Sequence, residues 1–251
     1  YTRAWTLLMI RVFMSYQNQA IREDKREFME YTVPVNMPRN MRYGSDYFEF
    51  KSRKINRIVT AFSDLEYWNQ ICLEMNYQVE KYCEQPLKTE VFFDGHVYET
   101  TFDMWVKYKD GSEEFQEIKY AEELEKEDAI TGRSYRQIAI QKAWCEQNGK
   151  NHIVRTDRDI FIGTNYVRNM LYLYPKALRI EGTDSIAEKH ILKFVDDRGM
   201  VTVGQLVNGG IISNKNGIDI LANLYYKGKI KFANITNEPF GFTTEVYVHG
   251  K

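Results

Sequence analysis

The sequence contains few cysteines and prolines, and their scarcity argues against several classes of protein. Its three cysteines, Cys72, Cys83 and Cys145, are an odd number and include no Cys-x-x-Cys pair. We therefore expect neither a disulfide scaffold nor a zinc site built from cysteines. The expected location is a reducing cytoplasm. Five prolines in 251 residues, with 43% hydrophobic residues, exclude a disordered or collagen-like chain.

The sequence also lacks a long apolar run. The longest is Trp5–Ile10, whose continuation is interrupted by Arg11, and it falls well short of the roughly 18 residues that a membrane span needs. The polar and bulky Ser15-Tyr-Gln-Asn that follows is not a signal-peptide cleavage site. We therefore predict no membrane span and expect this segment to dock on the protein itself.

An excess of charge of one sign is missing too, except in one segment. The 34 Lys and Arg residues are balanced by 35 Asp and Glu, so no global cationic field indicates a nucleic-acid coat protein. Residues 35–60, however, hold six basic residues against two acidic ones, with aromatic residues between them. Such a mixture can bind phosphates and stack on bases. The alternative is a solvated loop and edge hairpin. The residues predicted to contact DNA are Arg39, Arg42, Arg53, Lys54 and Arg57.

The middle of the chain has the pattern of a mixed α/β unit. The capping box Ser63-Asp-Leu-Glu66 predicts the start of a helix with Ser63 as N-cap. Residues 89–101 predict a hairpin that turns at Asp94-Gly95. Strands are expected over 102–108 and 114–120, then a helix that ends before Gly149. Short strands are expected after this helix, at 152–155 and 160–163. The buried residues predicted for the first helix are Leu65, Trp68, Cys72 and Met75. Those predicted for the second helix are Ile138, Ala139, Ala143 and Cys145.

The last seventy residues have a different pattern, that of three short helices and a wing. A second capping box, Ser185-Ile-Ala-Glu188, begins the first helix; Val201–Val207 predicts the second and Ser213/Asn214 begin the third. Two strands, at 230–232 and 246–248, complete a winged-helix plan. We thus predict an N-terminal extension (1–34), an α/β domain (35–180) and a winged-helix domain (181–251). Residues 180–251 have no net charge, which favours a protein-binding wing over one that binds DNA.

Candidate chemistry is concentrated in four residues. Asp103 begins one predicted strand, and Glu117 and Lys119 lie on one face of its hairpin partner, with Ile118 on the other. Two carboxylates and an ammonium can thus converge, with Glu66 as a third carboxylate. Oxygen ligands of this kind suit Mg²⁺, which activates water and neutralises a scissile phosphate. This constellation is suited to hydrolysing phosphodiesters.

Each of these residues also has a simpler interpretation. Glu66 can be only the capping glutamate, Asp103 only the start of a strand, and Lys119 a charged residue that protects a sheet edge. The spacing Asp-x(13)-Glu-x-Lys also occurs by chance. The four histidines have no metal-ligand spacing and are interpreted as surface or packing residues: His96, His152, His190 and His249.

The sequence also resembles a known family. The runs from Arg57 to Glu66, Glu84 to Leu87, Gln141 to Trp144 and Val154 to Asp159 are similar to TnsA, the endonuclease family of heteromeric TnsA/TnsB cut-and-paste transposases. TnsA belongs to the PD-(D/E)xK nucleases, and the resemblance covers about residues 31–251. It implies a restriction-endonuclease-like mixed sheet flanked by helices, followed by a C-terminal winged-helix domain.

The resemblance also implies roles for individual residues. Glu66, Asp103, Glu117 and Lys119 match the catalytic positions of the family. The first three, with the backbone carbonyl of Ile118, would bind one or two Mg²⁺ ions, with Mn²⁺ as a substitute. Phe102 stands where the superfamily name has proline, and Gln141 on the following helix is a further residue expected to face the site.

The function implied by the resemblance is cleavage of the 5′, non-transferred strand at transposon ends. The expected partners are transposon-end DNA, a TnsB-like transposase, and a TnsC-like AAA+ ATPase that contacts the winged-helix domain. The expected location is the bacterial cytoplasm, at the nucleoid when engaged. Two alternatives stay open: an autonomous restriction or repair nuclease of the same superfamily, and a non-catalytic adaptor that bridges transposition proteins.

Overall fold

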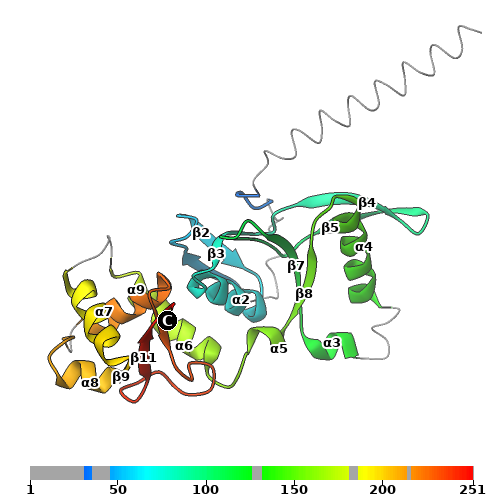
Figure 1. Ribbon diagram of the computed structural model, residues 1–251. Helices are drawn as coiled ribbons and strands as arrows, with labels where there is room; N and C mark the ends of the chain where they lie inside the picture. Colours follow the sequence, from blue (N-terminus) through cyan, green and yellow to red (C-terminus); the bar gives the residue numbers. More distant parts are fainter. Residues whose placement is uncertain (1–30, 36–45, 126–131, 181–185, 214–215, 251) are drawn as a thin grey trace, which may run out of the picture. The chain divides into compact units, whose positions relative to one another are not determined.

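A computed structural model describes residues 31–35, 46–125, 132–180, 186–213 and 216–250. Residues 33–251 form one compact unit, in which a mixed sheet is combined with helices (Figure 1). The predicted mixed α/β class is therefore confirmed. Within the described ranges, no helix is long and apolar enough to cross a bilayer; the apolar run at 5–10 lies outside them.

The central sheet has four strands in the order β3-β6-β7-β8. The first three are antiparallel, and β8 is parallel to β7, so the chain crosses over between these two strands through helices. The strands are β3 (Val79–Glu84), β6 (Met104–Tyr108), β7 (Glu113–Lys119) and β8 (His152–Thr156).

The sequence did not predict β3, and it predicted a strand at 160–163 that is wrong. Three consecutive residues of β3, Tyr82 to Glu84, are buried, so no period of two marks the strand. The segment after β8 is instead a helical turn, α5 (Asp157–Ile160). A capping box between Thr156 and Asp159 begins it.

The hairpin predicted around Asp94-Gly95 is confirmed as β4 (Lys88–Phe93) and β5 (His96–Thr101). Both turn residues have positive φ, 48° and 76°, as a two-residue hairpin turn requires. Helices α3 (Ala121–Glu125) and α4 (Arg133–Gln147) follow β7, and α4 packs against this hairpin and β8 (Figure 1).

The inner face of α4 differs from the prediction. Cys145 is buried as expected, but Ile138, Ala139 and Ala143 are only half-buried. Ile140 and the polar Gln141 take the innermost positions instead. A hydrophobic pattern cannot predict this face, because a hydrogen-bonded glutamine occupies its centre.

Helix α2 (Asp64–Met75) begins as its capping box predicts. The Ser63 hydroxyl accepts a hydrogen bond from the Glu66 N–H at 3.2 Å. The Glu66 carboxylate reaches back to the N–H of Phe62, one residue before the N-cap, at 3.1 Å. Leu65, Cys72 and Met75 are buried as predicted, and Trp68 is half-buried.

The segment before α2 forms a short antiparallel hairpin, β1 (Phe48–Lys51) and β2 (Ile58–Ala61). After α5 the chain forms helices, with a three-stranded sheet of order β10-β11-β9. The predicted third helix begins at Gly217, and β9, which was not predicted, pairs with β11, one of the two strands predicted to form a wing. These elements are α6 (Tyr166–Ala177), α7 (Ile186–Arg198), β9 (Met200–Thr202), α8 (Val203–Asn208), α9 (Gly217–Tyr226), β10 (Ile230–Phe232) and β11 (Glu245–Val248).

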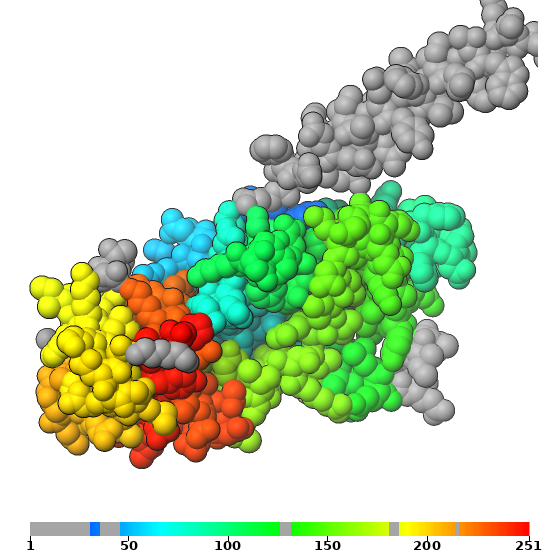
Figure 2. All heavy atoms as spheres, viewed as in Figure 1, coloured from blue at the N-terminus to red at the C-terminus, as the bar shows by residue number. Residues whose placement is uncertain are grey.

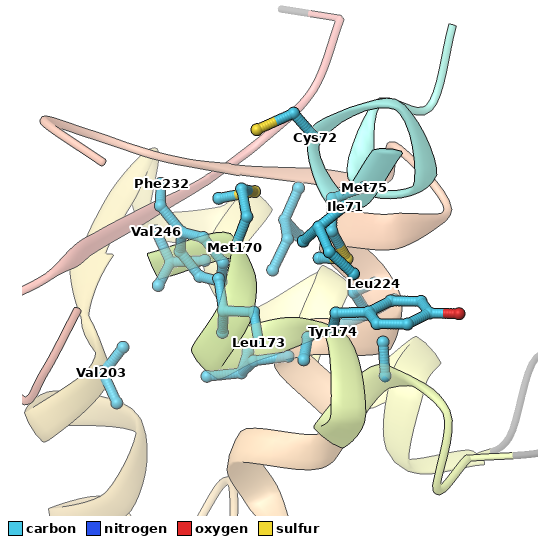
Figure 3. Close-up of a cluster of buried hydrophobic side chains, with 14 of the residues drawn as sticks. Ile71, Cys72, Met75, Met170, Leu173, Tyr174, Val203, Leu224, Phe232 and Val246 are labelled. Atoms are coloured by element: carbon cyan, nitrogen blue, oxygen red, sulfur yellow. The ribbon is translucent and has the colours of Figure 1, made fainter. Parts of the chain in front are cut away.

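One hydrophobic core joins α2 to these C-terminal elements. Met170 and Leu173 of α6 are fully buried in a cluster that includes residues of α2 and Leu224 of α9 (Figure 3). Phe232 and Val246 of the small sheet belong to the same cluster. The C-terminal elements, yellow to red, form a continuous surface in the space-filling view (Figure 2). The division of the chain near residue 180 stays a prediction.

A buried carboxylate strengthens this junction. Glu74 of α2 is wholly buried and accepts hydrogen bonds from the hydroxyls of Ser52 (2.6 Å), Tyr82 (2.7 Å) and Tyr226 (3.0 Å). The backbone N–H groups of Arg53 and Lys54 also donate to it, at 3.0 and 3.1 Å. Glu74 therefore ties the loop after β1, the sheet and α9 to one helix.

We predict that Glu74→Ala lowers the free energy of unfolding by about 3 kcal/mol, because five donors lose a charged acceptor inside the protein. Urea unfolding followed by circular dichroism measures the change. Glu80→Ala, at an exposed position of β3, is the matched control and is expected to change stability by less than about 0.5 kcal/mol. Equal effects of the two substitutions would contradict the role given to Glu74.

Candidate active site

Three elements position the four predicted site residues. Glu66 lies in the first turn of α2, Asp103 immediately precedes β6, and Glu117 and Lys119 end β7. Because Met104 pairs with Gln116, Asp103 lies beside the end of β7. There the N–H of Ile118 donates to Asp103 Oδ2 at 2.8 Å.

Glu117 is the most enclosed of the four. It is 0% exposed, and its Oε1 lies 2.6 Å from Lys119 Nζ, whose side chain is 17% exposed. Its other oxygen, Oε2, accepts a hydrogen bond from Gln141 Nε2 at 2.6 Å. The side chain of Ile118 is buried in the core. Glu117 and Lys119 thus share one face of β7, as the pleat predicts.

The electrostatics indicate that the carboxylates crowd one another. Burial raises the pKa of Asp103 well above its ordinary value, and the charges of Glu117 and Glu66 raise it further. Burial also raises the pKa of Glu66, to which the charge of Glu117 adds. For Lys119, burial lowers the pKa, but Glu117 and Asp103 more than offset this, so its pKa is raised. Three acids therefore share a partly buried space with one ammonium.

This donor set fits a hard divalent cation in its chemistry, since oxygen ligands and excess negative charge are what such an ion binds. Among the described residues, no group of three His, Cys, Asp or Glu side chains is already arranged around a common point that could hold a metal. Glu117 faces Lys119 and Gln141 instead. The ligand role of the Ile118 carbonyl stays a prediction.

Two further residues extend the site inward. Gln141, which the resemblance placed near the site, is wholly buried, and its Nε2 also donates to the Thr101 carbonyl at 3.1 Å. Gln141 Oε1 lies 3.0 Å from His152 Nε2, and burial lowers the pKa of His152 to about 4. From the sequence, His152 was expected to be a surface or packing residue. A polar Gln141 inside the face of α4 was the one sequence signal for this network.

The cations predicted to contact DNA have intramolecular roles. Arg57 forms a bidentate pair with Glu84, with both N–O distances 2.6 Å. Arg53 donates to Asn223 Oδ1 at 2.8 Å, and Lys54 Nζ donates to the carbonyls of Asn76 and Val79 at 2.9 and 2.8 Å. Burial lowers the pKa of Lys54 to about 8. Each of these three cations thus has partners within the protein. Arg39 and Arg42 lie outside the described residues.

Comparison with protein families finds one similarity in this region. Residues 76–157 match the family described as TnsA-like endonuclease N terminal. This part of the chain is similar to TnsA-like endonuclease domains. The matched segment contains Asp103, Glu117, Lys119, Gln141 and His152, whereas Glu66 precedes it. No curated protein matches the chain significantly. The resemblance to TnsA is thus confirmed, and the domain is of a nuclease type.

We predict that Asp103→Asn stabilises the metal-free TnsA-like chain. The folded chain binds the Asp103 proton more tightly than the unfolded chain, so wild-type stability falls as pH rises from the ordinary aspartate pKa of 3.8 toward the raised value. Asparagine has no charge to desolvate and retains an oxygen for the Ile118 N–H. At pH 7.5 we expect Tm to rise by roughly 2–4 °C, the shift that about 1 kcal/mol produces in a domain of this size.

Scanning calorimetry at several pH values measures this effect, with Asp46→Asn at an exposed position as the control. The difference in Tm between Asp103→Asn and wild type should shrink as pH falls toward 4. A lower Tm for Asp103→Asn at pH 7.5 would contradict the crowding of carboxylates at this site.

Proposed function

We propose that this chain is a divalent-metal-dependent DNA endonuclease and a subunit of a heteromeric cut-and-paste transposase, in which it hydrolyses the 5′, non-transferred strand at transposon ends. The observation that carries this proposal is the convergence of Glu66, Asp103 and Glu117 with Lys119 at the edge of a TnsA-like endonuclease domain. The chemistry of these groups is that of phosphodiester hydrolysis.

Glu66, Asp103, Glu117 and the carbonyl of Ile118 would hold one or two Mg²⁺ ions, or Mn²⁺ in their place. A metal bound there would supply an activated water and neutralise charge on the scissile phosphate. Lys119 Nζ, held beside Glu117, would orient the attacking water and stabilise the negative charge that develops on the phosphate oxygens. The products would carry 5′-phosphate and 3′-hydroxyl ends.

The C-terminal elements support a winged-helix module that binds protein. Their order, α7-β9-α8-α9-β10-β11, follows the winged-helix plan. In many such modules the third helix enters the DNA major groove. Here α9 packs against α6, and its Tyr226 donates to the buried Glu74. Of the wing lysines, Lys227 and Lys229 pair with Glu188. We therefore assign this module to contact with a TnsC-like AAA+ ATPase.

DNA would reach the site through a partner. The described cations of residues 46–60 that were predicted to contact DNA are engaged within the protein, and the chain as a whole has no excess of positive charge. A TnsB-like transposase would therefore deliver the transposon ends, in the bacterial cytoplasm at the nucleoid. This balance of charge argues against an autonomous restriction or repair nuclease, which must bind DNA alone.

We predict that the chain cuts the 5′ strand of a labelled transposon-end duplex with Mg²⁺ or Mn²⁺ when a TnsB-like partner is present. Lys119→Ala should reduce the cutting rate at least about 100-fold, because it removes the group that orients the attacking water. Lys88→Ala, at an exposed lysine of the β4–β5 hairpin, is the matched control and should leave the rate unchanged. Denaturing gels resolve which strand is cut.

Three other outcomes would revise the proposal. Cutting without any partner would indicate an autonomous nuclease. Unimpaired cutting by Lys119→Ala would remove this residue from the site. Absence of cutting under all conditions, together with absence of metal binding, would favour a non-catalytic adaptor.

A further inference from the structure

The amide of Gln141 connects β7, which carries Glu117, to the end of β5, which leads into Asp103. Its Nε2 has two hydrogens: one is directed to Glu117 Oε2 on β7 at 2.6 Å, and the other to the Thr101 carbonyl at 3.1 Å. Thr101 ends β5, two residues before Asp103. A single buried NH₂ group therefore holds Glu117 at a fixed position relative to the backbone that leads into Asp103.

Packing alone cannot fix the orientation of this amide, because its oxygen and its NH₂ group have nearly the same size. It is fixed by hydrogen bonding. If the amide were rotated by 180°, Oε1 would face the Glu117 carboxylate at a distance near 2.6 Å, and two acceptors would be opposed. The group that contacts Gln141 Oε1 determines whether the rotation is also opposed on that side of the amide.

That group is His152, the first residue of β8. Its Nε2 lies 3.0 Å from Gln141 Oε1, and its ring packs edge-on against Phe102. An amide oxygen has only lone pairs to offer, so the ring nitrogen that faces it must carry a hydrogen. Because burial disfavours the charged ring, His152 meets this need as a neutral imidazole protonated at Nε2.

We propose that His152 is a positioning residue of the nuclease site: as the neutral Nε2–H tautomer it donates to Gln141 Oε1, and it thereby directs the Gln141 amide toward Glu117 and Thr101. This inference rests on the proposed function for its effect on cleavage. The tautomer of His152 and the orientation of the Gln141 amide can be tested independently of the proposed function. His152 would act through Gln141. In metal sites, residues that hydrogen-bond to a metal ligand fix the orientation of that ligand in a similar way.

The first test is the tautomer of His152 in the metal-free, full-length protein. Two-dimensional ¹H–¹⁵N spectra that correlate ring nitrogens with ring carbon-bound protons distinguish Nε2–H, Nδ1–H and doubly protonated histidine. We expect His152 to be Nε2–H at pH 7.5 and to become Nδ1–H or mixed in Gln141→Leu, which removes the acceptor. An Nδ1–H or charged His152 in the wild type would overturn the proposal.

The second test is cleavage at limiting metal. His152→Phe retains an aromatic ring beside Phe102 but has no donor, and we expect a 10–100-fold slower cut together with a higher Mg²⁺ concentration for half-maximal rate. His152→Gln, which restores a side-chain N–H donor, should recover most of the rate. His96→Phe, at the exposed tip of the β4–β5 hairpin, is the matched control and should match the wild type.

Melting temperatures separate a positioning role from a structural one. If His152→Phe and His152→Gln melt alike but only the second cuts efficiently, the hydrogen bond and not the packing sets the rate. A His152→Phe variant that cuts at the wild-type rate, with an unchanged Mg²⁺ requirement, would overturn the proposal. If the wild type itself does not cut, the proposed function fails, whereas the tautomer measurement still decides the geometry.

Discussion

The arrangement of this domain depends on one buried charge, the carboxylate of Glu117. A carboxylate with no exposure to solvent is stable in its charged form only when a counter-charge and hydrogen-bond donors surround it. Lys119 supplies the charge from two residues away on β7, and Gln141 supplies a donor from α4. These needs account for a polar residue on the inner face of α4 and for a lysine that is mostly buried.

The same constraint produces a site that is electrostatically unbalanced. Burial raises the pKa of Asp103 and of Glu66, the charge of Glu117 raises both further, and one ammonium serves all three acids. Such crowding lowers the stability of the metal-free chain and increases its attraction for a cation. Stability is supplied elsewhere, by the core that α2 shares with α6 and α9 and by the hydrogen bonds that converge on Glu74.

The sequence predicted those features that depend on local chemistry. Asp94-Gly95 specified its hairpin turn, Ser63 the start of α2, and alternation along β7 placed Glu117 and Lys119 on one face. Strand β3 was missed because its consecutive buried residues leave no period of two. The pairing of Arg57 with Glu84 and the contact of His152 with Gln141 were missed because both depend on residues brought together only by the fold.

The proposal that the acidic cluster binds a divalent cation is tested most directly by calorimetric titration of Mn²⁺ into the full chain, in two buffers of different ionisation enthalpy. Metal binding to a carboxylate whose pKa is raised displaces its proton. We therefore expect binding of one or two ions with net proton release, and loss of that release in Asp103→Asn. Absence of binding, or binding that Asp103→Asn leaves unchanged in affinity and proton release, would contradict a metal site at these residues.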